Sequence, residues 1–163
     1  MEILFKQLGR LTKVAPVYFV YGNHENKINF TKNNIIILND QEVHLNNIIL
    51  IGRKDYTNKS RKKTKDYNPS TKTYNIVLDH QSQGTKENIK NNIDLQLSGH
   101  THNGQMFPLS FSYHLQANFA GNYGKETFNH CTKIISSGLV GWVFPIRTEG
   151  ICEYVVVNIT PKK

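Results

Sequence analysis

The chain has 163 residues and a mass of 18.7 kDa, and 20 Lys and Arg against 12 Asp and Glu give it a formal net charge of +8. A chain of this length suits one domain, which buries about 70% of the surface that the unfolded chain exposes. No apolar run approaches the roughly 18 residues of a membrane span, and no signal-peptide pattern opens the sequence. We therefore expect a cytoplasmic chain whose positive charge favours anionic partners, without choosing among phosphate esters, lipid headgroups and nucleic acid.

The two cysteines, Cys131 and Cys152, lie among apolar or strand-like neighbours and form no CxxC pair. This pattern favours reduced structural thiols over a disulfide or a redox site.

Apolar periodicity predicts a mixture of short helices and strands. Apolar residues at 3, 4, 8 and 11 recur near helical spacing, which predicts an amphipathic helix that ends around residue 12, before Pro16. Further helices are predicted at 85–93 and 112–119. Strands are predicted at 17–21, 35–38, 48–51, 76–78, 95–97, 134–136 and 154–159. The mixture indicates an α/β or α+β fold, with no visible domain boundary within residues 1–163.

Residues 53–65 contain seven basic side chains and a single acidic one, Asp55. The stretch has few apolar residues, so we predict a solvated loop. A dedicated anion-binding loop is the alternative.

Polar residues that can bind metal ions follow several of the predicted strands. They are Asn23, His24, His80, His100 and His102, after the strands at 17–21, 76–78 and 95–97. The carboxyl ends of strands are where ligand sites gather in α/β sheets. Imidazole nitrogens and an amide oxygen suit manganese, iron or zinc. In an extended stretch, His100 and His102 would point to the same side and serve one metal ion or two neighbouring ones.

Each of these residues also has a structural interpretation. A single histidine after a strand is more often a hydrogen-bonding residue than a ligand, and Gly-Asn is a common turn pair. The combination with the Gly-flanked His100 and His102 favours a site. His44, His114 and His130 have no comparable setting, so we interpret them as structural or exposed.

In this order, GNHE, IVLDH and GHTH resemble the last three metal motifs of the calcineurin-like metallophosphoesterases. The stretches DLQLSGHTHNGQMFP and ISSGLVGWVFPIRTEGICEYVVVNI resemble a bacterial, often membrane-associated branch of that family. The resemblance covers almost the whole chain from Val17 onward. It implies a four-layer αββα sandwich and hydrolysis of a phosphomonoester or phosphodiester at a two-metal centre.

Carried over by motif, the resemblance implies that Asn23, His80 and His100 bind one metal ion and that His102 binds the other. His24 would contact the substrate phosphate and assist the leaving group, as a general acid can. Two ions about 3.5–4 Å apart activate a hydroxide and neutralise charge on the phosphoryl oxygens. Asn103 stands where the family commonly has Gly.

The family also has an Asp-x-His motif and a Gly-Asp-x-x-Asp motif before GNHE, and this chain has no Asp before Asn23. We therefore interpret residues 1–163 as one domain that is the C-terminal part of a phosphoesterase, incomplete at its N-terminus, with at most one incomplete metal site. A late start of the reading frame, a deliberate shortening and a split protein would each explain this.

These interpretations predict a phosphate ester as substrate and an upstream segment or separate N-terminal half that supplies the missing ligands. A membrane surface is a further partner that the resemblance suggests. The alternative function is a catalytically degenerate module that binds anions, a membrane surface or nucleic acid. Nucleic acid is the least favoured partner, because the aromatic and basic residues do not interleave in an RNA-binding pattern.

Overall fold

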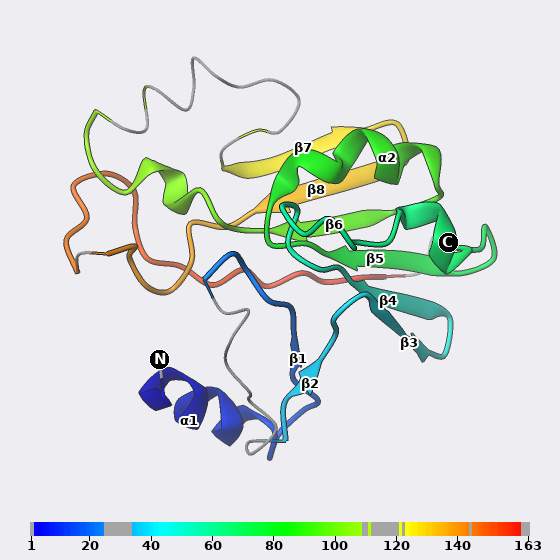
Figure 1. Cartoon of the computed structure of the whole chain (residues 1–163), viewed down its shortest axis with the longest axis horizontal. Helices are drawn as coiled ribbons and strands as arrows, with labels where there is room; N and C mark the ends of the chain where they lie inside the picture. The colour runs from blue at the N-terminus through cyan, green and yellow to red at the C-terminus, as the bar shows by residue number, and fades with distance from the viewer. Residues whose placement is uncertain are drawn as a thin grey trace.

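The computed structural model describes residues 2–24, 34–108, 111, 121, 123–143 and 145–160 (Figure 1). The helices are α1 (Glu2–Leu11) and α2 (Thr85–Lys90), with short 3-10 turns η2 (Thr64–Tyr67), η3 (Ser82–Gly84) and η4 (His102–Gly104). The strands are β1 (Tyr18–Phe19), β2 (Ile36–Ile37), β3 (Gln41–Leu45), β4 (Ile48–Gly52), β5 (Tyr74–Leu78), β6 (Leu95–Ser98), β7 (Gly124–Phe128) and β8 (Cys131–Ile135).

The central sheet has six strands in the order β3-β4-β5-β6-β8-β7. The four inner strands are parallel, and β3 and β7 join the two edges as antiparallel hairpin partners of β4 and β8. Gly52 lies opposite Leu78, and Leu78 lies opposite Leu97. The inner strands therefore end at one edge of the sheet, where the loops that follow them meet.

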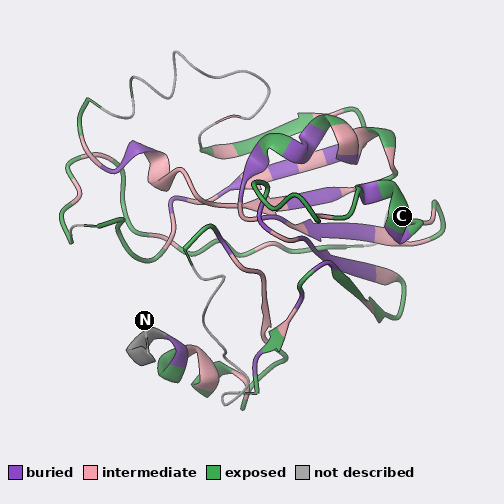
Figure 2. Ribbon diagram, viewed as in Figure 1, coloured by how far each residue is buried: buried purple, intermediate pink, exposed green. Residues whose placement is uncertain are grey.

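Three apolar clusters separate four layers of secondary structure. The first cluster lies between α2 and the central sheet. It contains Ile89 and residues at alternate positions of the strands, such as Ile51 and Val77. The neighbouring positions Leu50 and Ile76 face the opposite side, as the two-residue period of a strand requires. A third cluster packs α1 against the small parallel sheet of β1 and β2. The mixed α/β architecture agrees with the αββα arrangement expected from the sequence (Figures 1 and 2).

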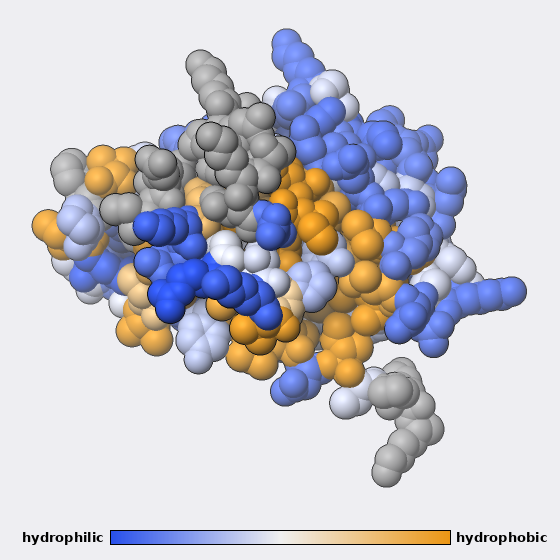
Figure 3. All heavy atoms as spheres, turned by 90° about the horizontal axis from the view of Figure 1, so that it is seen from below, coloured by the Kyte–Doolittle hydropathy of each residue, from blue (hydrophilic) through white to orange (hydrophobic). Residues whose placement is uncertain are grey.

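Residues 151–160 run beneath the central sheet without a strand assignment (Figure 1). Val157 packs against the cluster of Leu50 and Ile76, whereas Tyr154 and Val156 are 76% and 71% exposed. The prediction of a paired strand at 154–159 is therefore wrong within the described chain, because the segment lies along the sheet face and has no ladder of hydrogen bonds. Seen from below, the molecule shows a broad apolar area (Figure 3).

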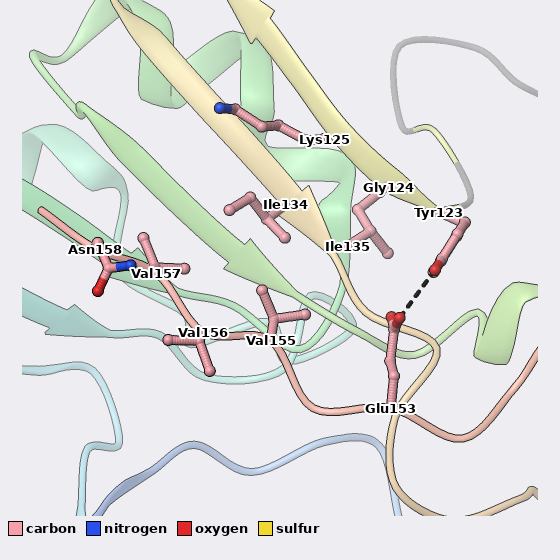
Figure 4. Close-up of a pocket in the computed structure, with 10 residues that line it drawn as sticks. All are labelled: Tyr123, Gly124, Lys125, Ile134, Ile135, Glu153, Val155, Val156, Val157 and Asn158. Atoms are coloured by element: carbon pink, nitrogen blue, oxygen red, sulfur yellow. Dashed lines mark hydrogen bonds between the residues drawn. The ribbon is translucent and has the colours of Figure 1, made fainter.

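A cavity of about 370 Å³ lies between this segment and the β7–β8 hairpin (Figure 4). Its walls are largely apolar, with Ile134 on one side and Val155 on the other. At one end the Tyr123 hydroxyl donates a hydrogen bond to Glu153 at 2.9 Å. The cavity contains none of the predicted metal ligands.

The loop at 53–65 is exposed at most of its positions, as predicted for a solvated stretch, but three of its side chains are buried. Arg53, Asp55 and Thr64 are each at most 2% exposed. The Asp79 carboxylate accepts hydrogen bonds from both terminal nitrogens of Arg61, and Arg53 pairs with Glu87 at 3.1 Å. Opposite charges from β5 and α2 thus hold the basic loop against the sheet, because a buried charge needs a partner.

Asp40 fixes the other side of the same loop. It accepts hydrogen bonds from the backbone N–H groups of Lys54 and Lys62 at 3.0 and 2.9 Å and from the Tyr67 hydroxyl at 3.0 Å. Burial and the neighbouring Asp40 carboxylate raise the pKa of the Tyr67 hydroxyl, so the phenol stays protonated and continues to donate.

The two cysteines are both free thiols, Cys131 buried and Cys152 exposed. The helix predicted at 112–119 falls outside the described residues. No helix in the described part of the chain is long and apolar enough to cross a membrane.

Candidate metal centre

All five predicted site residues lie in the described part of the chain, in loops that follow strands. Asn23 and His24 come after β1, His80 comes two residues after β5, and His100 comes two residues after β6. Since β5 and β6 are adjacent parallel strands, their carboxyl ends bring His80 and His100 together.

Three of these side chains converge on one point. His80 Nε2 lies 3.1 Å from Asn23 Oδ1 and 2.9 Å from His100 Nδ1. The two imidazole rings meet edge to face, with centroids 4.8 Å apart. Residues 57 positions apart in the sequence are thus in direct contact at this site.

The converging atoms have too few protons to satisfy one another. An imidazole nitrogen carries at most one hydrogen, so His80 Nε2 cannot donate well to Asn23 and also form a good bond with His100. A divalent cation removes this conflict, because all three atoms can then offer lone pairs.

The spacing also fits a cation. With ligand bonds of about 2.1 Å, adjacent ligand atoms of an octahedral ion lie about 3 Å apart, as these do. No group of three His, Cys, Asp and Glu side chains in the described chain could hold a metal ion. The cluster instead combines two imidazoles with an amide, which is an incomplete ligand set.

Burial keeps the histidines in the neutral form that binds metals. It lowers the pKa of His80 to about 4, with a further contribution from the neighbouring His100. Burial also lowers the pKa values of His100 and His102. At neutral pH each ring is therefore neutral and offers one nitrogen lone pair, while its other nitrogen carries a proton.

His102 and His24 lie on the periphery of this cluster. His102 Nδ1 is buried and has no hydrogen-bond partner in the described structure. A hydrogen bond with the backbone of Val140 acts against burial and raises the pKa of this ring. The exposed His24 contributes to lowering the pKa values of His80, His100 and His102, and its Nε2 lies 3.2 Å from Asn23 Nδ2.

The loop that carries the last two histidines differs from the extended stretch assumed from the sequence. His100, His102 and Asn103 have positive φ angles of 72°, 51° and 50°. Left-handed backbone at several non-glycine residues is strained, and such strain clusters at functional sites. The backbone N–H of Asn103 donates to Thr101 Oγ1 at 3.4 Å and helps to close the turn.

The calcineurin-like phosphoesterase family model matches residues 1–104, which include all five site residues. The chain belongs to the calcineurin-like phosphoesterase family. A Helicobacter pylori protein described as an uncharacterized metallophosphoesterase is 32% identical over 95% of this chain. Residues 1–163 span 45% of the length of that relative.

Two further relatives come from other organisms. A metallophosphoesterase of Aquifex aeolicus, also described as uncharacterized, is 28% identical over 99% of this chain and 67% of its own length. A Bos taurus transmembrane protein with a metallophosphoesterase domain is 32% identical over 90% of this chain and 39% of its own length. No solved structure matches the chain.

Several residues that support the loops of this candidate site were not predicted from the sequence as site residues. Arg147 donates to the backbone carbonyls of His102 and Ser137 at 2.7 and 3.2 Å, which ties the histidine loop to the loop after β8. Gln105 donates to the carbonyls of Trp142 and Ile146 at 3.0 and 2.9 Å. The position of Gln105 directly after the GHTH-containing turn could have identified it from the sequence. No comparable sequence pattern identifies Arg147.

Proposed function

We propose that the complete protein is a metal-dependent phosphoesterase that hydrolyses a phosphomonoester or phosphodiester. The approach of Asn23 Oδ1 and His100 Nδ1 to His80 Nε2, at 3.1 and 2.9 Å, is the observation that carries the proposal. Family membership sets the reaction class, and divalent ions supply the Lewis acidity for attack of water on phosphorus.

In this proposal Asn23, His80 and His100 hold one ion, and His102 contributes to a second. Two ions of manganese, iron or zinc suit nitrogen and amide ligands of this kind. The exposed His24, beside Asn23, contacts the substrate phosphate and delivers a proton to the leaving oxygen. The +8 charge of the chain attracts the anionic substrate from solution.

The second ion needs acidic ligands that the described loops around it do not offer. We propose that they come from a segment upstream of this chain or from a separate N-terminal half. Two observations support such a partner: the chain spans 45% of its Helicobacter pylori relative, and residues 151–160 expose an apolar extended segment. A strand added beside that segment would satisfy its backbone and cover its side chains.

Hydrolysis of p-nitrophenyl phosphate and bis(p-nitrophenyl) phosphate by the complete protein tests the function. We expect His100→Ala to lose one bound ion together with activity. His24→Ala should keep its metal and lose about 100-fold in kcat, the contribution of one general acid. His44→Ala on β3 is the matched control, because that exposed ring contacts only Glu42 among the described hydrogen bonds.

Unchanged metal content and unchanged hydrolysis in His100→Ala would contradict the proposal. Metal binding without hydrolysis of either ester by the complete protein would instead favour a degenerate binding module.

A further inference from the structure

Asp55 has a buried carboxylate, and one of its two oxygens has no hydrogen-bond partner among the described residues. The residue is 1% exposed, and its Oδ1 accepts the backbone N–H of Thr57 at 3.0 Å. Its Oδ2 is buried and has no hydrogen-bond partner among the described residues. Nothing proposed so far for the metal centre uses this residue.

The sheet places Asp55 beside the metal loops. β4 and β5 are parallel neighbours, and the backbone N–H of Arg53 donates to the Leu78 carbonyl at 3.0 Å just beyond the paired region. The backbone N–H of Tyr56 donates to Gln81 Oε1 at 2.9 Å. Arg53 and Tyr56 lie on either side of Asp55, and Leu78 and Gln81 lie on either side of His80. The two bonds therefore place Asp55 and His80 at neighbouring strand ends.

A negative charge at this strand end attracts a cation held by the neighbouring loop without touching it, because Coulomb attraction is strong in a partly buried site.

Other buried carboxylates of the same region are compensated. Asp79 is paired with Arg61, and Asp40 is paired with Lys54 and Tyr67. A buried carboxylate oxygen without a partner destabilises the folded state. Among these three carboxylates, only Asp55 has a buried oxygen without a hydrogen-bond partner, and Asp55 lies at the strand end next to that of His80.

We propose that Asp55 is a positioning residue of the metal centre, whose buried charge favours the cation held by Asn23, His80 and His100. These three ligands are neutral, so the cation brings uncompensated positive charge into the site. Asp55 balances part of that charge without being a ligand. The inference rests on the proposed metal site.

Titration of the 163-residue chain with Co²⁺, followed by visible absorption of the ion, measures the effect. The test variant is Asp55→Asn, which keeps the shape of the side chain and the hydrogen bond from Thr57. The control is Asp40→Asn, which replaces a buried carboxylate that has hydrogen-bond partners. We expect Asp55→Asn to raise the Kd for Co²⁺ about ten- to a hundredfold, as loss of outer-shell partners does. Asp40→Asn should leave that Kd unchanged.

Urea unfolding of the metal-free proteins separates this role from a purely structural one. Without its ion, Asp55→Asn should unfold at the same or a higher urea concentration than the unsubstituted chain, because an uncompensated charge has been removed. Asp40→Asn should unfold at a lower one. Equal Co²⁺ affinity, or a metal-free Asp55→Asn chain that is as destabilised as Asp40→Asn, would overturn the inference.

The His100→Ala variant distinguishes failure of the proposed metal site from failure of the proposed role of Asp55 alone. If it binds Co²⁺ as the unsubstituted chain does, the proposed metal site itself is wrong and the role of Asp55 falls with it. If His100→Ala loses Co²⁺ while Asp55→Asn binds it normally, only the inference about Asp55 is overturned.

Discussion

His80 Nε2 and His100 Nδ1 lie 2.9 Å apart at the ends of two adjacent parallel strands. This contact follows from the pairing of β5 with β6, because each histidine comes two residues after its strand. The sheet therefore arranges part of the proposed metal centre before any ion is bound, which would lower the cost of ordering the ligands on binding.

The Arg61–Asp79 pair supports the loop next to His80. Both side chains are at most 7% exposed, and removing one partner of a buried pair leaves an unpaired charge. We expect Arg61→Ala to lower the free energy of unfolding by about 3 kcal/mol. Urea unfolding followed by circular dichroism measures this. Lys59→Ala, in an exposed part of the same loop, is the control and should change little.

Asp40 makes the stability of the chain depend on acid pH. Burial alone would raise its pKa, but hydrogen bonds from Lys54, Lys62 and Tyr67 hold the pKa below the ordinary value of 3.8. Its contribution is complete above the unfolded pKa and is lost as pH falls through the folded one. The stability difference between the unsubstituted chain and Asp40→Asn should be constant from about pH 7 to 5 and shrink below about pH 4. A difference that grows on acidification would contradict this assignment.

The two thiols should differ in reactivity. Burial, assisted by Asp94, raises the pKa of the Cys131 thiol to about 11, so it stays protonated and inaccessible at neutral pH. Cys152 is exposed. Iodoacetamide should label Cys152 in the folded chain and Cys131 only after unfolding, as mass spectrometry of the peptides would show. Equal labelling rates at both positions would refute the burial of Cys131.

Neighbouring valines of the extended segment test its orientation. Val156 is 71% exposed, whereas Val157 packs against the central sheet. We expect Val156→Lys to change the free energy of unfolding by less than about 0.5 kcal/mol, measured by urea unfolding, because the side chain lies in solvent. Val157→Lys should lower the free energy of unfolding by about 2 kcal/mol, since it removes a packed apolar side chain. The reverse pattern would show that the segment faces the other way.

Much of the fold was predictable because burial leaves a direct pattern in the sequence. The apolar run of β4 and the helical spacing of α1 were identified within a few residues of their bounds. The edge strand β3 (QEVHL) was missed, because an edge strand with one central semi-buried residue has no apolar run. β7 (GKETF) escaped prediction for the same reason, since its central positions are all exposed.

The candidate site was also predictable only in part. The proximity of Asn23, His80 and His100 was predictable because each is a ligand-type residue after an apolar strand, while their role as metal ligands stays a prediction. The anchoring of the basic loop by Arg53 and Arg61 was not, because it depends on Glu87 and Asp79, which lie well beyond that loop in the sequence. Asp55 was read only as part of the charge count, since its unpaired oxygen exists only in the folded chain.

Anomalous diffraction from crystals of the chain grown with Zn²⁺ would test the metal centre most directly. A zinc peak should lie about 2.0–2.2 Å from Asn23 Oδ1, His80 Nε2 and His100 Nδ1, as oxygen and nitrogen ligands require. A fully occupied zinc site elsewhere, with no peak among these three atoms, would contradict the assignment of this loop cluster as a metal centre.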